Sequence, residues 1–216
     1  MFLIYNDTGV SSESVQALID FLSPIDTVQC VLGSDIQTDR LLSKATCFIM
    51  PGGRSLPFYE KCGQRGNEAI IRFVQNGGRY LGLCAGAYYA AQKTVFAQGL
   101  PLELILPGKL NFFKGRAIGP AFSATEFAYQ TENGALSVDI ILKNGSKQAV
   151  YFNGGCYFEN AERVKNTEVL AHYAATQQPA IIACSVGRGM AVLSGVHPEL
   201  SAHSDVLLAL FFSRRQ

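Results

Sequence analysis

Short apolar runs alternate with helical patterns in the N-terminal part of the sequence, and this alternation constrains the fold more than any other feature. The runs FLIY (2–5), TVQCVL (27–32), CFIM (47–50) and RYLGLC (79–84) have the length and the β-branched or aromatic content of buried strands. Between them, helices are predicted over 11–22, 35–44 and 66–75, the first capped by Ser11 or Ser12. This order of elements predicts βαβ units and a parallel sheet.

From about residue 100 onward, the apolar runs follow one another with no helical pattern between them, which favours antiparallel strands. They are GRAIGP (115–120), TEFAYQT (125–131), LSVDIIL (136–142), QAVYFN (148–153), VLAHYA (169–174), AIIACSVG (180–187) and GMAVLSGVHPE (189–199). A last helix is predicted over 201–212. We therefore expect an α/β fold, a flavodoxin-like three-layer sandwich with a mostly parallel central sheet, helices on both faces and extra antiparallel strands in the C-terminal half.

Composition and charge argue against several classes of protein. The chain is 48% hydrophobic and 16% charged with a formal net charge of +1, which gives no electrostatic support for a nucleic-acid partner. The opening residues MFLIYND do not resemble a signal peptide, and no apolar run is long enough to span a membrane, so a cytoplasmic location is expected. The six cysteines form no CxxC pair and no zinc pattern with the three histidines, and neither a metal nor another cofactor is expected.

Cys84 lies in GLCAGAY, where the strand RYLGLC meets a segment with the composition of a helix, AGAYYAAQ. Cysteine is among the most buried residue types, so a core thiol is the first interpretation. However, the small residues Gly82, Ala85 and Gly86 would leave the side chain clear on a tight turn, and the start of a helix would favour the thiolate. The Ala85 amide would then be placed to stabilise an oxyanion.

This strand, GxCxG and helix arrangement resembles the nucleophile elbow of the class I glutamine amidotransferase-like superfamily, and two more segments resemble it. PGG (51–53) ends the strand CFIM, and the resemblance makes the Gly53 amide a second oxyanion donor. In SGVHPE (194–199), it makes His197 the general base and Glu199 the residue that orients the imidazole. In a strand-like segment residues two apart project the same way, so Glu199 can lie beside His197. A plain turn remains the alternative for PGG and for HPE.

Tyr88 distinguishes this chain from superfamily members that use glutamine, which commonly carry G-x-C-x-G-x-Q. A closer resemblance is to the biotin–protein ligase N-terminal-like family. It rests on YNDTGVSSES (5–14), MPGGRSLPFY (50–59), GLCAGAYYA (82–90), FFKGRAIGP (112–120), YFNGGCYFE (151–159) and LSGVHPE (193–199). The resemblance implies a single class I glutamine amidotransferase-like domain over 1–216. No ligase domain is expected in this chain, and biotin transfer is not predicted.

Further residues are candidates for the wall of a substrate pocket. They are Asn6, Asp7, Gly52, Arg54, Tyr88, Asn153, Gly154 and Gly155. Each has a structural alternative: turn chemistry for Asn6 and Asp7, a surface ion pair for Arg54, core packing for Tyr88 and a hairpin turn for 153–155. The resulting hypothesis is a cysteine-dependent hydrolase or amidotransferase-like enzyme that acts on a C–N amide bond through a thioester.

In this hypothesis Cys84, His197 and Glu199 form the triad, and the substrate is a small-molecule or peptide amide. The alternative is a non-catalytic small-molecule-binding or regulatory module on the same fold. A redox or glyoxal-handling protein of the superfamily is a third interpretation. It is disfavoured because the elbow of that branch relies on an acidic residue from an early strand, whereas HPE supplies the more usual triad here.

Overall fold

The computed structural model describes residues 1–201 and residue 206. The first elements are β1 (Phe2–Tyr5), α1 (Ser12–Leu22), β2 (Val28–Val31), η1 (Asp35–Gln37), α2 (Asp39–Leu42), β3 (Cys47–Met50), α3 (Ser55–Gln75), β4 (Arg79–Leu83) and α4 (Ala85–Ala90). They are followed by β5 (Ala91–Phe96), β6 (Leu104–Pro107), β7 (Phe113–Gly119), β8 (Leu136–Leu142), β9 (Lys147–Phe152), β10 (Tyr157–Phe158), η2 (Ala161–Arg163), β11 (Thr167–Tyr173), β12 (Pro179–Val186), β13 (Gly189–Ser194) and η3 (Pro198–Leu200). The helix predicted over 201–212 lies outside the described residues.

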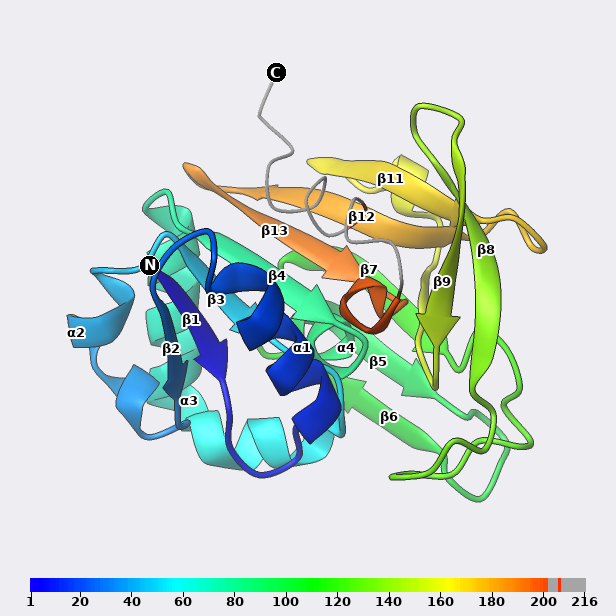
Figure 1. Ribbon diagram of the computed structural model, residues 1–216, viewed down its shortest axis with the longest axis horizontal. Coiled ribbons are helices and arrows are strands. Elements are labelled where there is room, and N and C mark those ends of the chain that lie inside the picture. The colour runs from blue at the N-terminus through cyan, green and yellow to red at the C-terminus, as the bar shows by residue number, and fades with distance from the viewer. Residues whose placement is uncertain (202–205, 207–216) are drawn as a thin grey trace.

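A nine-stranded sheet runs through the molecule in the order β2-β1-β3-β4-β13-β12-β11-β8-β9 (Figure 1). The strands from β2 to β13 in this order are parallel, and those from β12 to β9 pair antiparallel. A second, four-stranded sheet has the order β10-β7-β5-β6. The predicted flavodoxin-like α/β architecture, with its added antiparallel strands, is confirmed.

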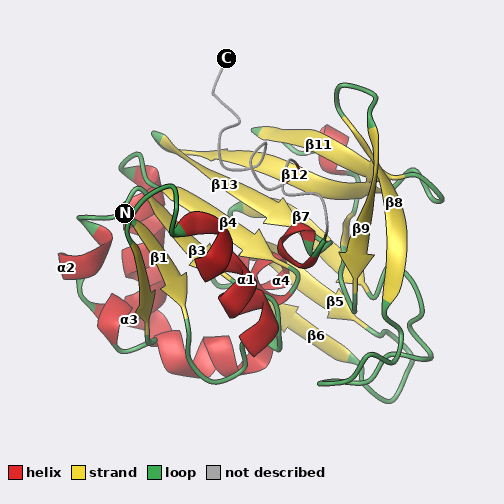
Figure 2. Ribbon diagram, viewed as in Figure 1, coloured by secondary structure: helices red, strands yellow, loops and turns green. Residues whose placement is uncertain are grey.

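The parallel strands are buried on both faces because their side chains alternate between two apolar clusters. In β1, Leu3 and Tyr5 belong to one cluster, while Phe2 and Ile4 belong to the other. The first cluster lies against α3 and α4, and the second lies against α1, so helices cover both faces of the sheet (Figure 2). A continuous apolar run such as FLIY is therefore what a central parallel strand requires.

Helix α1 begins and packs as its sequence predicts. The Ser11 hydroxyl accepts a hydrogen bond of 3.2 Å from the Ser14 amide, which makes Ser11 the N-cap. Val15, Leu18 and Leu22 lie on the buried face. Helix α1 also contacts η3, so it places Ser14 next to the C-terminal HPE segment.

Several element boundaries differ from the sequence-based prediction. Helix α3 begins at Ser55 instead of residue 66 and is kinked at Gly63, where φ is 59°. The helix after Cys84 ends at Ala90, and β5 and β6 follow before residue 110. The sequence predicts neither strand, and AGAYYAAQ, which includes the first two residues of β5, has a helical composition throughout. Tertiary pairing with β7 decides the conformation from Ala91 onward.

TEFAYQT (125–131) was predicted as a strand, and this prediction is wrong, since the whole segment lies in turns and loop. Ser123 and Gln130 have positive φ angles of 51° and 61°, and the Phe127 amide donates to the Ser123 carbonyl across a turn. The alternating aromatic residues that suggested a strand instead pack on Phe96: the ring centroids of Phe127 and Tyr129 lie 5.3 and 5.9 Å from it.

Candidate active site

Cys84 occupies a strained turn between β4 and α4. Its φ of 45° and ψ of −101° lie outside the regions that non-glycine residues commonly adopt. The turn is held by three backbone hydrogen bonds: the Cys84 amide donates to the Ser194 carbonyl (2.8 Å), and the Cys84 carbonyl accepts from the Ala87 (2.9 Å) and Tyr88 (3.0 Å) amides. The side chain is only 4% exposed, and its sulfur lies 3.6 Å from the Asn153 carbonyl oxygen. Strained backbone held by its surroundings is characteristic of functional sites.

Gly82 and Gly86 permit this turn. A Cβ atom on Gly86 would lie 2.1 Å from the Met50 carbonyl oxygen, and one on Gly82 would lie 2.5 Å from the Gly86 carbonyl oxygen. Both positions therefore require glycine for close packing of α4 against β3 and β4. The small residues around Cys84 thus serve the tight corner itself.

His197 and Glu199 form a buried hydrogen-bonded pair. The distance from His197 Nδ1 to Glu199 Oε1 is 2.8 Å, and their exposed fractions are 4% and 8%. The sequence predicts that a strand brings these two side chains together, but the structure has a turn at this position. Strand β13 ends at Ser194, His197 precedes the short η3 helix, and this turn brings the two side chains together.

Ser14 holds the far side of this pair, a role that the sequence did not suggest. Its hydroxyl donates a 2.7 Å hydrogen bond to the same Glu199 oxygen, Oε1, and accepts one of 3.3 Å from the Gly52 amide. Ser14 is fully buried. A continuous chain of hydrogen bonds therefore connects the PGG turn through Ser14 and Glu199 to His197.

The pKa of His197 is raised well above its ordinary value. Burial alone would lower it, because imidazolium loses its hydration, but the Glu199 carboxylate and the Cys84 side chain offset that loss. Cys84 is thus near enough to His197 to influence its protonation, while its sulfur lies 3.6 Å from the Asn153 carbonyl oxygen. The three side chains thus form one electrostatic unit.

Two backbone amides beside Cys84 have no hydrogen-bond acceptor among the described residues. Gly53 forms an isolated bridge with Val10, in which the bonds run from the Arg54 amide to Gly9 and from the Ser11 amide to Gly52. The Gly53 N–H is therefore left free. The Ala85 N–H is also free, because a residue in the first turn of a helix has no intrahelical acceptor.

Cys84 and His197 open onto a cavity of about 480 Å³, which we call the main cavity. Its lining is Gly9, Val10, Ser11, Ser12, Glu13, Gly53, Arg54, Cys84, residues 127–132, Tyr151, Asn153, His197 and Leu200. Most of this wall carries no signal in the sequence. This holds in particular for the 127–132 loop, whose alternating pattern is also typical of a strand.

Polar contacts tie this loop to the opposite wall. The Tyr151 hydroxyl donates to Glu132 (2.8 Å), and the Asn153 side-chain amide donates to the Thr131 carbonyl (2.9 Å). Burial and the bond to Glu132 raise the pKa of Tyr151 to about 12, so its hydroxyl stays protonated at neutral pH. The Asn153 Oδ1 atom is buried and has no hydrogen-bond partner among the described residues.

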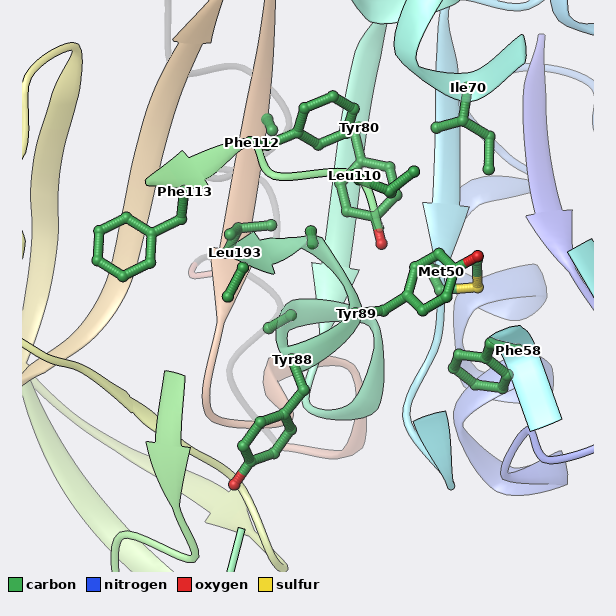
Figure 3. Close-up of a cluster of buried hydrophobic side chains, with 14 of the residues drawn as sticks. Met50, Phe58, Ile70, Tyr80, Tyr88, Tyr89, Leu110, Phe112, Phe113 and Leu193 are labelled. Atoms are coloured by element: carbon green, nitrogen blue, oxygen red, sulfur yellow. The ribbon is translucent and has the colours of Figure 1, made fainter. Parts of the chain in front are cut away.

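A second, much smaller space of about 30 Å³ adjoins the main cavity at Cys84, and we call it the aromatic slot. It shares Cys84, Gly53, Arg54, Phe127, Tyr129 and Asn153 with the main cavity and is further lined by Ser55, Ala85, Tyr88, Thr94, Phe96, Leu104 and Gly154. Tyr88 lies in its wall and donates a 3.1 Å hydrogen bond to the Gly154 carbonyl. Figure 3 shows Tyr88 and Tyr89 pointing away from one another, Tyr89 toward Met50 and Phe58.

Of the other residues predicted to line the pocket, Arg54 does so and Asn6 and Asp7 do not. Arg54 lines both spaces, and its guanidinium carbon lies 4.7 Å from the Tyr129 ring centroid. Asn6 and Asp7 line neither space; the Asp7 carboxylate instead accepts bonds from the Thr8 and Gly33 amides, as in a turn.

Gly52 and Gly155 support the site from behind and do not line either space. A Cβ atom on Gly52 would lie 2.4 Å from His197 Cε1, and one on Gly155 would lie 1.7 Å from the Gly195 carbonyl oxygen. Gly52 thus gives the imidazole its room. Cys156, which follows Gly155, is fully buried, and burial raises its pKa well above the ordinary value.

Within residues 1–201 and 206, no group of three or more His, Cys, Asp and Glu side chains is arranged to hold a metal ion. In the same part of the chain, no helix combines the length and the apolar character needed to cross a bilayer.

The fold is that of the glutamine amidotransferases. The structure superposes on a crystal structure of a glutamine amidotransferase with a TM-score of 0.68, at 18% sequence identity and 96% coverage of both chains. In sequence, the family model "Biotin-protein ligase, N terminal" matches residues 1–208. The chain belongs to this family.

Two relatives place the family match in context. The chain is 34% identical over 218 residues to a biotin–protein ligase of Schizosaccharomyces pombe, covering 95% of this chain and 34% of that protein. It is 34% identical over 206 residues to an uncharacterized protein of Chlamydia muridarum, covering 91% of this chain and 79% of the relative. The chain therefore spans about a third of the yeast ligase.

Proposed function

We propose that this chain is a cysteine-dependent amide hydrolase or acyl transferase. The observation that carries the proposal is the buried His197–Glu199 pair, 2.8 Å apart, which is coupled to a cysteine on a strained strand-to-helix turn at the edge of a cavity. A nucleophile, a base and a group that orients the base are the minimum set for acyl transfer by a thiol.

In the proposed mechanism, the Cys84 sulfur attacks the carbonyl carbon of an amide. The free N–H groups of Gly53 and Ala85 stabilise the negative charge on the carbonyl oxygen. His197, whose raised pKa keeps the proton taken from the Cys84 thiol on the imidazole, delivers it to the leaving nitrogen, while Glu199 holds the imidazole and stabilises its charge. Water or an amine then resolves the thioester.

The proposal is tested by labelling the protein with a panel of amide-mimicking electrophiles and competing each with cell metabolites. We expect labelling at Cys84, protection by the natural substrate, and loss of that substrate's turnover in Cys84→Ala. Matched Cys→Ala substitution at the exposed Cys30 is the control and leaves turnover unchanged. Undiminished turnover in Cys84→Ala would contradict the proposal.

A second candidate is a small-molecule-sensing module that acts in the context of a biotin–protein ligase. Its support is the match of this chain to about a third of the Schizosaccharomyces pombe ligase. Such a module needs the cavity but no reactive thiol. A Cys84 that reacts no faster than a free thiol at neutral pH, in a protein that still binds a metabolite, would favour this candidate over the enzyme.

A further inference from the structure

The two spaces beside Cys84 differ in size and in their access to the imidazole. The main cavity has about 480 Å³, is partly polar and is lined by His197. The aromatic slot has about 30 Å³ and is lined by Ala85, Tyr88 and Phe96 but not by His197. Because Cys84 lines both spaces, a substrate with its carbonyl carbon at the Cys84 sulfur can place one part in each.

The position of His197 decides which space takes the amine part of the substrate and which takes the acyl part. The leaving nitrogen must receive a proton from the imidazole, so it has to lie within hydrogen-bond reach of His197. Because His197 lines only the main cavity, the amine part of the substrate lies there. The acyl substituent then lies in the aromatic slot.

The slot favours a small acyl group. A site for one water molecule needs about 10–15 Å³, so 30 Å³ has room for about two non-hydrogen atoms beyond the carbonyl carbon. Its walls are also fixed: the Tyr88 and Phe96 ring centroids lie 5.7 Å apart, Tyr88 is bonded to Gly154, and Thr94 Oγ1 donates to the Tyr88 carbonyl (3.1 Å).

We propose that the substrate is a polar amine carrying a small N-acyl group, of formyl or acetyl size, which the protein removes. This inference rests on the proposed function and gives it a substrate class. It reverses the arrangement of a primary carboxamide substrate such as glutamine, in which the acyl part is large and the leaving group is ammonia.

The reaction is a hydrolysis. The Cys84 sulfur bonds to the acyl carbon, the carbon–nitrogen bond breaks, and the thiol proton passes through His197 to the departing amine. Water then attacks the thioester with His197 accepting its proton, the carbon–sulfur bond breaks, the proton passes from His197 to the Cys84 sulfur, and the small carboxylic acid leaves. Water is the co-reactant, and no oxidant or reductant is needed.

The test measures acylation of Cys84 by p-nitrophenyl acetate, butyrate and hexanoate, each rate divided by that of glutathione with the same ester. We expect the acetate rate to exceed the hexanoate rate by at least about 10-fold, since a poorly fitting methylene costs about 10- to 200-fold. Adducts are located on Cys84 by peptide mass spectrometry, with Cys84→Ala as the blank.

A matched pair of variants on β6 shows whether the slot causes this preference. Leu104 lines the slot, while the next residue, Ile105, is 41% exposed and lines neither space. Leu104→Ala should raise the relative butyrate rate about 10-fold, and Ile105→Ala should leave it unchanged. The same change in both variants would overturn the assignment of the slot.

A parallel incubation with L-glutamine tests the reversed orientation. Under our inference, Cys84 gains an acetyl group from the ester and no glutamyl group, and no ammonia appears. A hexanoate preference, or a glutamyl adduct with ammonia release, would overturn the small-acyl assignment while leaving Cys84 as the nucleophile. If every ester reacts with Cys84 no faster than with glutathione, the proposed function fails as well.

Discussion

At the scale of single residues, Ser14 is the least obvious member of the site. Its hydroxyl bonds to the Glu199 carboxylate at 2.7 Å and accepts from the Gly52 amide at 3.3 Å. Through these bonds it connects the residue that orients His197 with the turn that carries the free Gly53 amide. We therefore regard Ser14 as a positioning residue for the proposed reaction.

Ser14→Ala should leave the Gly52 amide without an acceptor and Glu199 with one bond fewer. A buried group deprived of its partner costs about 1–3 kcal/mol in the free energy of unfolding, measurable by urea denaturation. The pH profile of Cys84 alkylation should shift as well, which a purely structural role would not cause. Ser34→Ala, an exposed serine whose side chain makes no cap bond, is the matched control and should change neither quantity. An unaltered pH profile in Ser14→Ala would exclude the positioning role.

Glu199→Gln tests the electrostatic unit. Burial lowers the pKa of His197, but Glu199 and Cys84 together raise it by more than burial lowers it, so the net shift is upward. Because the pKa of His197 is higher in the folded than in the unfolded protein, protonation of His197 stabilises the fold at pH values below its pKa in the unfolded chain, about 6.5. This stabilisation is lost as pH rises through the pKa of His197 in the folded protein. Removing the carboxylate should lower the pKa of His197, as measured by NMR titration of the imidazole.

The stability of the two proteins should follow the same sign. The advantage of the wild type over Glu199→Gln in unfolding free energy should be largest at mildly acidic pH and should shrink as pH rises through the wild-type pKa of His197. Urea titrations at several pH values measure this difference. An advantage that grew with pH would mean that Glu199 does not support the imidazolium.

Much of the site could be predicted from residues, and the rest depends on tertiary contacts. GxCxG placed Cys84 at a strand-to-helix corner because small residues at that spacing allow a tight turn, and the corner is present. His197 and Glu199 were predicted to be neighbours for the wrong local reason, since a turn and not a strand brings them together. Ser14 carries no local signal, because its partner is 185 residues away.

At the scale of elements, the short helix α4 fixes the position of Cys84 through close packing. Because Gly86 has no side chain, α4 packs closely against β3. A Cβ atom at this position would lie only 2.1 Å from the Met50 carbonyl oxygen. The elbow can therefore move only if β3 or β4 moves with it.

Gly86→Ala should destabilise the protein by about 1–3 kcal/mol or more, because an added methyl group in a filled space forces the backbone apart. It should also slow alkylation of Cys84. Gly66→Ala in α3 is the matched control: its Cβ atom would lie 3.3 Å from Cys62 Cβ, a contact that a small shift relieves. Denaturant titration of both variants measures the difference, and equal stability would contradict the packing argument.

The element predictions succeeded where the hydrophobic period was decisive. Strand β1 and helix α1 have the bounds that FLIY and SSESVQALIDFL indicate, since their apolar residues leave one conformation that buries them. TEFAYQT fits a strand equally well on pattern alone. It forms a loop because its aromatic residues pack on Phe96, and a strand also needs a partner edge, which local sequence does not report.

At the scale of the whole molecule, one sheet separates two apolar clusters, so neither cluster can unfold and leave the other intact. We therefore propose that the chain behaves as a single domain. It has nine tyrosines and no tryptophan, so tyrosine fluorescence and far-UV circular dichroism report on it together. Their urea transitions should coincide, and transitions at separate midpoints would show two units.

The central claim, that Cys84 is an activated nucleophile, is tested most directly by comparing two cysteines of the same molecule. Cys84 is 4% exposed and Cys30 is exposed, so accessibility alone makes Cys30 react first. Limited alkylation with iodoacetamide at neutral pH, resolved by peptide mass spectrometry, gives both rates. The account predicts that Cys84 reacts faster in the wild type and loses this advantage in His197→Gln. Faster reaction of Cys30, with no change in Cys84 on substitution of His197, would contradict it.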